Sequence, residues 1–211
     1  MNLLTIRLGA IILWAVLATV PVRAGGTTEA PEPAEPAATT EPAGTTDAEA
    51  QMKTLLDGIG IRTFEGDIAA VDFGIPRLGG DQTSLSDFQG EFVFLNFWAT
   101  WCPPCREEMP SMDAMHAELE DLPLRILAVN VQESPDVVES FVREEGYRFP
   151  VLLDESGRVA AHYGVRGIPT TYFISPAGRV LGMLVGTRYW DEPDVLDTMR
   201  EIARLAATLQ G

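Results

Sequence analysis

The sequence predicts an α/β domain in which a central mixed β-sheet is flanked by helices. Two segments, 92–98 and 125–131, are almost continuously apolar, which is typical of strands that are covered on both faces. From residue 51 onward, segments with helical periodicity alternate with strand-like segments, as they do in α/β proteins. The chain has 211 residues, of which 46% are hydrophobic, so it can form one ordinary domain with additional segments.

The first elements of this domain lie before the strand at 92–98. A short helix is expected at 51–57. The segments 72–78 and 83–85 flank the turn-forming residues 79–82, and this arrangement predicts a β-hairpin at the edge of the sheet. The hairpin would be an N-terminal extension of the domain.

A helix is expected to follow the strand at 92–98. It should begin near Cys102 and end at about Glu120, with a bend at Pro110, because proline has no amide hydrogen to donate to the helix. The second apolar strand comes next. After it, Ser134 has the properties of an N-cap for another helix.

The last part of the domain is expected to complete the sheet and to cover it with one more helix. The helix that starts after Ser134 should end at Gly146. Further strands are predicted at 151–153, 171–174 and 180–185, with a short helix that ends at residue 164 between the first two. The C-terminal helix is amphipathic, and the residues expected to face the core are Val195, Leu196, Met199, Ile202 and Leu209.

The N-terminal part of the chain differs in composition from this domain. Residues 1–24 contain an apolar run at 8–20, which predicts an export signal that is either cleaved or retained as a membrane anchor. Residues 25–50 contain only Gly, Ala, Thr, Pro, Glu and Asp, so they are expected to form a disordered acidic tether. A lead-in segment at 51–67 would then connect the tether to a domain at 68–211.

The chain is strongly acidic, with 31 Asp and Glu residues against 15 Lys and Arg residues and a formal net charge of −16. Such a surface repels polyphosphate, so nucleic acid is not expected as a partner. The chain has two cysteines. This number excludes a disulfide-rich scaffold and a zinc site with four cysteine ligands.

Both cysteines lie in one motif, Cys102-Pro103-Pro104-Cys105, where a buried strand leads into a helix. A cysteine at a helix N-terminus lies close to unpaired amide groups, which stabilise the thiolate and lower the pKa of the thiol. Cys102 is therefore the expected nucleophile. Cys105 follows by just under one helical turn, so it can bond to Cys102, and we expect it to be the more buried, resolving thiol.

The same two cysteines allow other roles. Covalent haem attachment requires a histidine directly after the second cysteine, and Arg106 stands there instead. Copper or zinc binding would need a histidine ligand, but His116 and His162 fall in periodic segments typical of structural or surface residues. A purely structural disulfide is a further alternative, although so small a ring adds little stability. We expect no metal and no cofactor other than the redox-active cysteine pair.

Two motifs together resemble those of a known family. Residues 97–110 read FWATWCPPCREEMP, and residues 167–172 read GIPTTY. At this separation they resemble the TlpA/ResA group of extracytoplasmic thiol-disulfide oxidoreductases, with a match over about residues 68–209. The resemblance implies a thioredoxin-like fold.

The resemblance also implies a substrate-binding surface. Pro169 corresponds to the family's cis-proline, whose loop, together with Ile168, is implied to face the cysteines and to bind an extended segment of the substrate. A trans proline at a turn is the alternative. Trp101 and Pro103 are expected to bind the substrate, with Trp101 at the exposed rim around Cys102, whereas Trp98 is expected in the core.

Two polar residues near the motif carry further implications. Glu108 matches a glutamate that is counted with the active site in the ResA-like subgroup, and its offset from Cys105 would let it exchange a proton with the thiols. A solvated glutamate beside Glu107 is the alternative. Asn96 stands where cytoplasmic thioredoxin has a buried aspartate, and an amide cannot accept a proton in the same way.

Together the motifs predict an exported thiol-disulfide oxidoreductase. Similar family members reduce the cysteines of apocytochromes c before haem attachment or serve oxidase maturation. The resemblance therefore implies a protein disulfide or dithiol as substrate, a membrane thiol transporter as electron donor and a location outside the cytoplasm. The alternatives are a peroxiredoxin-like thiol peroxidase and a non-catalytic copper or zinc chaperone that uses Cys102 and Cys105.

Overall fold

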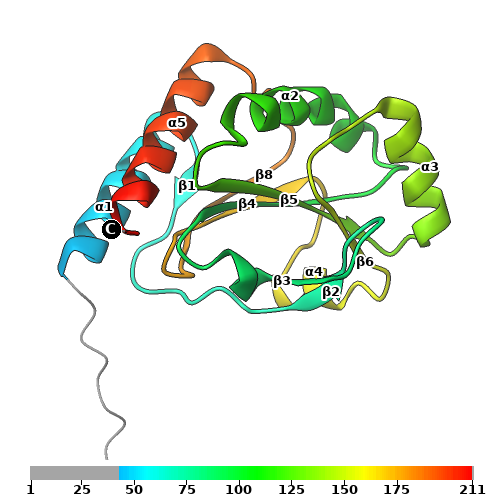
Figure 1. Ribbon diagram of the computed structural model, residues 1–211, viewed down its shortest axis with the longest axis horizontal. Helices are drawn as coiled ribbons and strands as arrows, with labels where there is room; N and C mark the ends of the chain where they lie inside the picture. The colour runs from blue at the N-terminus through cyan, green and yellow to red at the C-terminus, as the bar shows by residue number, and fades with distance from the viewer. Residues whose placement is uncertain (1–42, 211) are drawn as a thin grey trace, which may run out of the picture. The chain divides into compact units, whose positions relative to one another are not determined.

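The computed structural model describes residues 43–210 (Figure 1). The expected export signal or anchor at 1–24 and most of the expected tether at 25–50 lie outside these residues. Within 43–210, no helix is long and apolar enough to cross a membrane. The described residues form a mixed β-sheet with flanking helices, which confirms the predicted fold class.

The central sheet has its strands in the order β1-β8-β7-β4-β5-β6. β4, β5 and β6 run parallel to one another, whereas β7, β8 and β1 each pair antiparallel with their neighbours. Since β4 and β7 are antiparallel neighbours, the C-terminal end of β4 lies beside the N-terminal end of β7. The bounds of the strands are β1 (Arg62–Thr63), β4 (Phe92–Trp98), β5 (Leu124–Val131), β6 (Val151–Asp154), β7 (Thr170–Ile174) and β8 (Val180–Val185).

The helices lie on both faces of this sheet, with α2 on one side and α4 on the other (Figure 1). Ser134 is the N-cap of α3, and Gly146 ends that helix in a left-handed conformation, with φ at 77°. Both boundaries were predicted from the sequence. The bounds of the helices are α1 (Ala43–Gly58), α2 (Pro103–Leu119), α3 (Pro135–Glu145), α4 (Arg158–His162) and α5 (Pro193–Thr208).

Alternate side chains of β4 enter two separate cores, because successive residues of a strand point to opposite faces. All residues of β4 are buried. One core is covered by α1, α2 and α5, and from β4 it receives Phe92, Phe94 and Trp98. The other core lies on the side of α4, and from β4 it receives Val93, Leu95 and Phe97. The prediction of a strand covered on both faces is confirmed.

The predicted hairpin is present but forms a small sheet of its own. β2 (Gly74–Pro76) pairs antiparallel with β3 (Gln82–Ser84). The hairpin contacts the edge of the central sheet through a bridge between Arg77 and Leu152 of β6. A short 3-10 helix, η1 (Leu85–Phe88), follows it and was not predicted.

Helix α1 corrects two of the predicted boundaries. The tether was expected to extend to residue 50 and the helix to cover only 51–57, but α1 already begins at Ala43. The lead-in segment is also not separate from the domain, because Met52 and Leu56 of α1 are buried in the core that α2 and α5 cover. Strand β1, which pairs with β8, was too short to predict.

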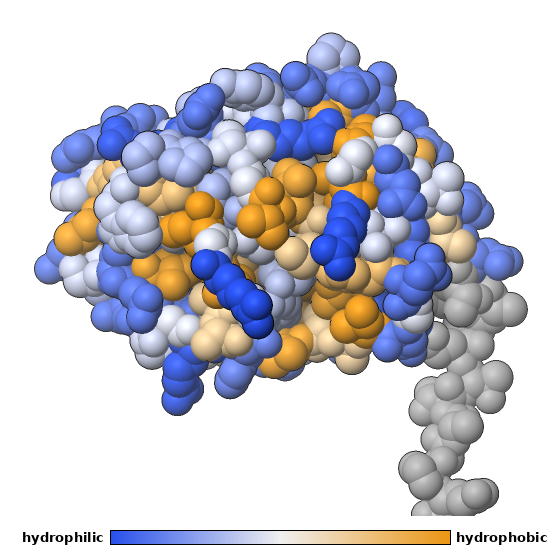
Figure 2. Space-filling model, turned by 180° about the vertical axis from the view of Figure 1, so that it is seen from behind, coloured by the Kyte–Doolittle hydropathy of each residue, from blue (hydrophilic) through white to orange (hydrophobic). Residues whose placement is uncertain are grey.

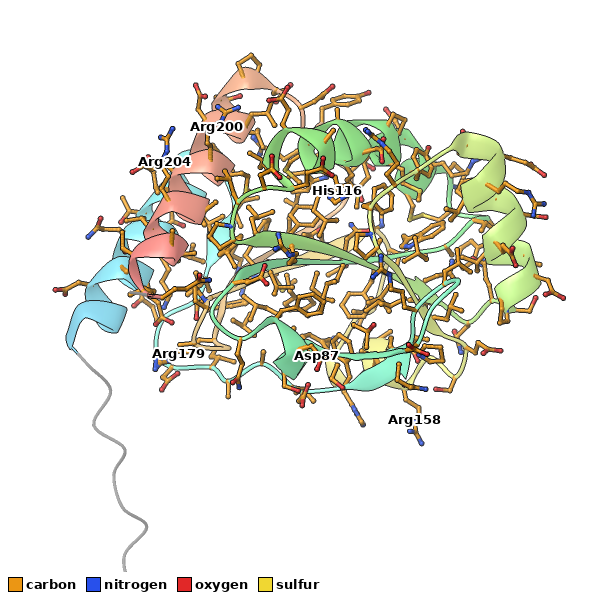
Figure 3. The ribbon with its side chains drawn as sticks, viewed as in Figure 1. Asp87, His116, Arg158, Arg179, Arg200 and Arg204 are labelled. Carbon is orange, nitrogen blue, oxygen red and sulfur yellow. A yellow bond between two sulfur atoms is a disulfide. The ribbon has the colours of Figure 1, made fainter. Side chains whose placement is uncertain are left out.

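The part of α1 that precedes residue 51 makes polar contacts that composition does not reveal. Glu49 is buried and accepts a hydrogen bond from the Ser175 hydroxyl. Its carboxylate also lies 3.5 Å from Arg179, which is labelled in Figure 3 and pairs with Asp67 at 2.8 Å. Burial raises the pKa of Glu49, and the Ser175 hydrogen bond partly opposes that rise. The partners of Glu49 are distant in sequence, so a local composition rule cannot detect them.

Figure 2 shows one face of the molecule, on which apolar groups lie between hydrophilic side chains. Single exposed apolar residues are normal in soluble proteins. Between residues 47 and 210, Trp101 is the most exposed large apolar side chain, at 67%. The other exposed large apolar residues between 47 and 210 are Ile68, Val71, Val137, Val185 and Tyr189.

Candidate active site

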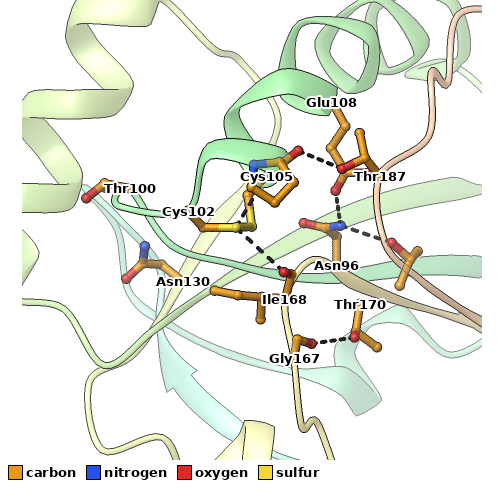
Figure 4. The surroundings of a disulfide bond; sticks show 12 residues. Asn96, Thr100, Cys102, Cys105, Glu108, Asn130, Gly167, Ile168, Thr170 and Thr187 are labelled. Atoms are coloured by element: carbon orange, nitrogen blue, oxygen red, sulfur yellow. Dashed lines mark hydrogen bonds between the residues drawn. A yellow bond between two sulfur atoms is a disulfide. The ribbon is translucent and has the colours of Figure 1, made fainter.

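The two cysteines lie at the start of α2, shortly after the end of β4. They form a disulfide bond with Cα atoms 5.3 Å apart (Figure 4). Cys102 is the N-cap of α2, and Pro103 and Pro104 occupy the first turn. Proline fits there because the first amides of a helix have no partner within the helix. Cys102 is 2% exposed and Cys105 0%, so the expected order of burial is confirmed.

The sulfur of Cys102 lies at the positive end of α2. The Cys105 amide donates a hydrogen bond to this sulfur over 3.3 Å. A sulfur that caps a helix also experiences the dipole of that helix, and both effects stabilise a negative charge more than a neutral thiol. The reduced form of Cys102 is therefore suited to be the thiolate nucleophile.

The loop before β7 faces this sulfur. The Ile168 carbonyl oxygen lies 3.7 Å from the Cys102 sulfur, and the peptide bond between Ile168 and Pro169 is cis, as the resemblance implies. The Pro169 carbonyl accepts a hydrogen bond from Gly186, which connects this loop to the end of β8. The antiparallel pairing of β4 and β7 brings the two motifs together, although they are far apart in sequence.

Three of the residues predicted to bind the substrate are at least partly accessible. Trp101 and Pro103 are exposed, and Ile168 is half-buried. Trp98, in contrast, is completely buried and packs against Phe141 of α3. The predicted difference between the two tryptophans is therefore confirmed.

Glu108 lies on the inner side of the disulfide and is 0% exposed, so the alternative of a solvated glutamate is wrong for this residue. Its Oε1 accepts a hydrogen bond from the Asn96 amide at 2.9 Å. Its Oε2 accepts from the Arg188 backbone amide at 3.2 Å and from the Trp190 indole at 3.3 Å. Burial raises the pKa of Glu108 to about 7, while these three hydrogen bonds act in the opposite direction.

Asn96 connects Glu108 to the sheet. Its amide group also donates to the Thr171 hydroxyl of the neighbouring strand, over 2.9 Å. Its side-chain oxygen is buried and has no hydrogen-bond partner among the described residues. In Figure 4 this oxygen lies on the side of the disulfide.

Sequence reasoning did not identify the segment after β8 as part of the site. Arg188 and Trp190 bond to Glu108, and the Thr187 hydroxyl donates to the Pro104 carbonyl at 3.0 Å. The Trp190 backbone amide also donates to the Ser111 hydroxyl at 2.9 Å. A lone tryptophan between a strand and a helix was the only sequence signal for this segment.

No cluster of three or more His, Cys, Asp and Glu side chains that could hold a metal ion occurs between residues 47 and 210. Each cysteine sulfur is bonded to the other. His116 lies 3.9 Å from Glu120, and His162 is exposed at the end of α4. The arrangement therefore favours redox chemistry of the sulfur pair.

Comparison with known proteins agrees with this geometry. Residues 67–183 match the model of the AhpC/TSA family. The chain is 41% identical over 118 residues to thiol-disulfide oxidoreductase ResA of Bacillus subtilis (strain 168), and 42% identical over 118 residues to ResA of Geobacillus thermodenitrificans (strain NG80-2). The matched segment is 56% of this chain and 66% and 68% of these two relatives.

Solved structures show the same similarity. A putative thiol:disulfide interchange protein DsbE from Chlorobium tepidum is 31% identical, with a TM-score of 0.60, and the match covers 67% of this chain and 99% of that one. A secreted thiol-disulfide isomerase from Corynebacterium glutamicum is 27% identical, with a TM-score of 0.56, over 65% of this chain and 85% of that one. The chain thus belongs to the AhpC/TSA family and, within it, to the ResA-like thiol-disulfide oxidoreductases.

Proposed function

We propose that this chain acts outside the cytoplasm as a dedicated reductant of disulfide bonds in a partner protein. The observation that carries the proposal is the position of Cys102. Its sulfur caps α2, accepts the Cys105 amide hydrogen and faces the loop that contains Pro169. The sulfur of Cys105, which is bonded to Cys102, is completely buried.

The first chemical step is an attack of the Cys102 thiolate on a disulfide of the substrate. A bond forms between Cys102 and one substrate sulfur, and the other substrate sulfur leaves as a thiolate. The low pKa expected for Cys102 makes the attacking form available at neutral pH. The exposed Trp101 and Pro103, together with Ile168, provide the surface against which the substrate segment lies.

The second step releases the reduced substrate. Cys105 loses its proton and attacks the Cys102 sulfur, which regenerates the disulfide of the enzyme and expels the second substrate thiolate. Two electrons have then passed from the cysteine pair to the substrate. Because Cys105 is completely buried, its proton needs a nearby acceptor, and Glu108 with a pKa of about 7 is suited to this role.

The proposed biological setting is supported by the resemblance to ResA-like proteins and by the predicted export signal or anchor at 1–24. We assign the substrate to apocytochromes c or to a protein of oxidase maturation. A membrane thiol transporter would return electrons to the cysteine pair, since the chain is expected to contain no other redox group. The acidic tether would hold the domain at a distance from the membrane.

The alternatives fit the site less well. A peroxidatic cysteine does not need a partner two residues away, whereas here Cys102 and Cys105 are bonded to each other. A copper or zinc chaperone would need further ligands, and no such cluster occurs in the described part of the chain. Measuring peroxide consumption with a thiol donor, and metal retention after gel filtration, tests both alternatives directly.

Two experiments test the proposed function. Titration of the full chain against a dithiothreitol or glutathione series should show one reversible two-electron transition, and its absence would contradict thiol-disulfide exchange. The variant Cys105→Ser should retain its natural partner as a mixed disulfide, since the resolving thiol is missing. Cys102→Ser is the matched control and should trap nothing. Recovery of only cytoplasmic proteins or small thiols would contradict the proposed setting.

A further inference from the structure

Glu133 contacts the segment that leads from β4 to Cys102. It lies in the loop between β5 and α3. Its Oε2 accepts hydrogen bonds from the Thr100 backbone amide and from the Asn130 side-chain amide, each over 2.7 Å. Its Oε1 accepts a third hydrogen bond, from the Thr100 hydroxyl, over 2.5 Å. Three donors thus converge on one half-buried carboxylate that is outside the cysteine motif.

The backbone beside Glu133 has an unusual conformation that places this carboxylate. Gln132 is the one non-glycine residue with a positive φ, 60°, in the described part of the chain. Such a conformation is uncommon for a side chain of this kind and is often found at functional sites. The Gln132 amide donates to the Asp154 carbonyl at 3.0 Å, and a Cβ at Gly157 would lie 2.8 Å from the Gln132 side chain.

Through Thr100, the Glu133 carboxylate can influence the position of Cys102. The chain turns between Ala99 and Cys102, where the Cys102 amide donates to the Ala99 carbonyl at 3.2 Å. Trp101 lies within the turn and is exposed. The direction of the Trp101 side chain and of the Cys102 sulfur therefore depends on how the Thr100 backbone is held. Glu133 accepts one hydrogen bond from the Thr100 backbone amide and one from the Thr100 hydroxyl.

We propose that Glu133 is a positioning residue for the thiol-disulfide exchange. Its hydrogen bonds to Thr100 hold the turn so that the Cys102 sulfur stays at the N-terminus of α2, opposite Ile168. The proposal rests on the exchange chemistry of Cys102. It adds a residue that touches neither sulfur but determines how much thiolate stabilisation Cys102 receives from the helix.

The hydrogen bonds and the charge of Glu133 have opposite expected effects. The hydrogen bonds keep Cys102 at the helix end and so lower the pKa of its thiol. A negative charge close to the same helix end disfavours a second negative charge on the sulfur. Gln can keep all three hydrogen bonds, because its carbonyl accepts from the two amides and its amide donates to the Thr100 hydroxyl, which can rotate. Glu133→Gln thus removes the charge alone, whereas Glu133→Ala removes both.

The test measures the alkylation rate of Cys102 with iodoacetamide across pH 4–10, in full-length chains that carry Cys105→Ser. Glu133→Ala should raise the pKa of Cys102 and lower its alkylation rate near pH 6 about tenfold, the size of effect expected for one charge-assisted hydrogen bond. Glu133→Gln should retain the wild-type rate or exceed it. Thr100→Val, which removes the hydroxyl and leaves the amide, should show a smaller loss than Glu133→Ala.

Glu139→Ala is the matched control, because Glu139 is an exposed glutamate of α3 whose carboxylate lies 3.9 Å from Arg143. It should leave the alkylation profile unchanged. An unchanged profile in Glu133→Ala would overturn the proposal, and so would an equal loss in Glu133→Gln and Glu133→Ala. If Glu133→Ala does not fold, the alkylation profiles of Thr100→Val and Glu133→Gln still test the proposal. An unchanged profile in Thr100→Val together with a loss in Glu133→Gln would then overturn it. Failure of the exchange itself would show separately, as a missing redox transition in the wild type.

Discussion

The two sides of the Cys102–Cys105 disulfide differ in exposure and in polarity. On the outer side, Trp101 and Pro103 are exposed to solvent. On the inner side, Asn96 and Glu108 are completely buried, and Glu108 receives hydrogen bonds from β4 and from the segment after β8. The outer side can therefore contact a partner protein, while the inner side can hold and move a proton without access to bulk water.

In the proposed exchange, this difference gives the two cysteines separate roles. The sulfur that meets the partner needs to be a thiolate before the partner arrives, and Cys102 has the helix N-terminus for that purpose. The sulfur that resolves the mixed disulfide must keep its proton until then. Cys105 lies in the apolar and amide-lined interior, where burial raises the pKa of a thiol. Changes on the inner side should thus affect resolution, and changes on the outer side should affect recognition.

The largest effect is expected for Glu108→Gln. Gln has nearly the shape of Glu but cannot accept the Cys105 proton, and a general base contributes typically about 10²-fold or more to a rate. Resolution of a preformed mixed disulfide should slow roughly 100-fold near pH 7 and lose the dependence on a group with a pKa of about 7. Stopped-flow release of a labelled thiol measures this step. Overlapping pH profiles for wild type and variant would mean that the carboxylate does not take the proton.

The same carboxyl group should make stability depend on pH. Its pKa is about 7 in the folded protein and 4.5 as an ordinary glutamate, so the folded state binds the proton more tightly. The resulting stabilisation is present below pH 4.5 and is lost as pH rises to about 7, by roughly 3 kcal/mol. Denaturant unfolding at pH 5 and pH 8 should show this loss in the wild type and not in Glu108→Gln. If the unfolding free energy changed equally between pH 5 and pH 8 in the two chains, the raised pKa of Glu108 would be contradicted.

A smaller effect is expected on the outer side, for Trp101→Ala. Exchange with a small disulfide should stay within about twofold of wild type, because Cys102 keeps its place at α2. Exchange with the partner protein should fall about tenfold, since exposed tryptophans often dominate the binding energy of an interface. Ile68→Ala is the control, because Ile68 is also exposed but lies far from the cysteines along β8. Its carbonyl accepts a hydrogen bond from Val180 at the start of β8, whereas the cysteine site lies near the end of β8. A parallel loss with both disulfides would show that Trp101 affects Cys102 itself.

The sequence was most informative where the local pattern has a single interpretation. The continuous apolar run at 92–98 leads to a strand buried on both faces, and β4 has those bounds. Ser134 and Gly146 mark the ends of α3 because capping depends on residues within one or two turns. The cysteine motif also depends on local residues, because α2 begins at Pro103, directly after Cys102. The motif was therefore enough to locate the site.

Features that depend on distant contacts were not predicted. The early part of α1 contains Glu49, which accepts a hydrogen bond from Ser175, and these residues are separated by 126 positions. The burial of Glu108 depends on Arg188 and Trp190, which are 80 and 82 positions away. The resemblance pointed to Glu108, but only the fold shows that its carboxylate is enclosed. No sequence motif pointed to Glu133, because its proposed role depends on a contact with Thr100. These two residues follow the ends of the neighbouring strands β5 and β4.

The smallest effect is expected for Glu107→Gln, which is the strictest control for Glu108. Glu107 is adjacent in sequence but exposed, and its carboxylate accepts a hydrogen bond from the Tyr189 hydroxyl at 2.7 Å. This hydrogen bond and the charge of Glu107 raise the pKa of Tyr189, so the variant should return it toward the ordinary value in an ultraviolet titration. Resolution and stability should change little, within about 0.5 kcal/mol for unfolding. If Glu107→Gln slowed resolution as much as Glu108→Gln, the acidity of the helix would matter rather than burial, and the distinction between the two sides of the disulfide would fail.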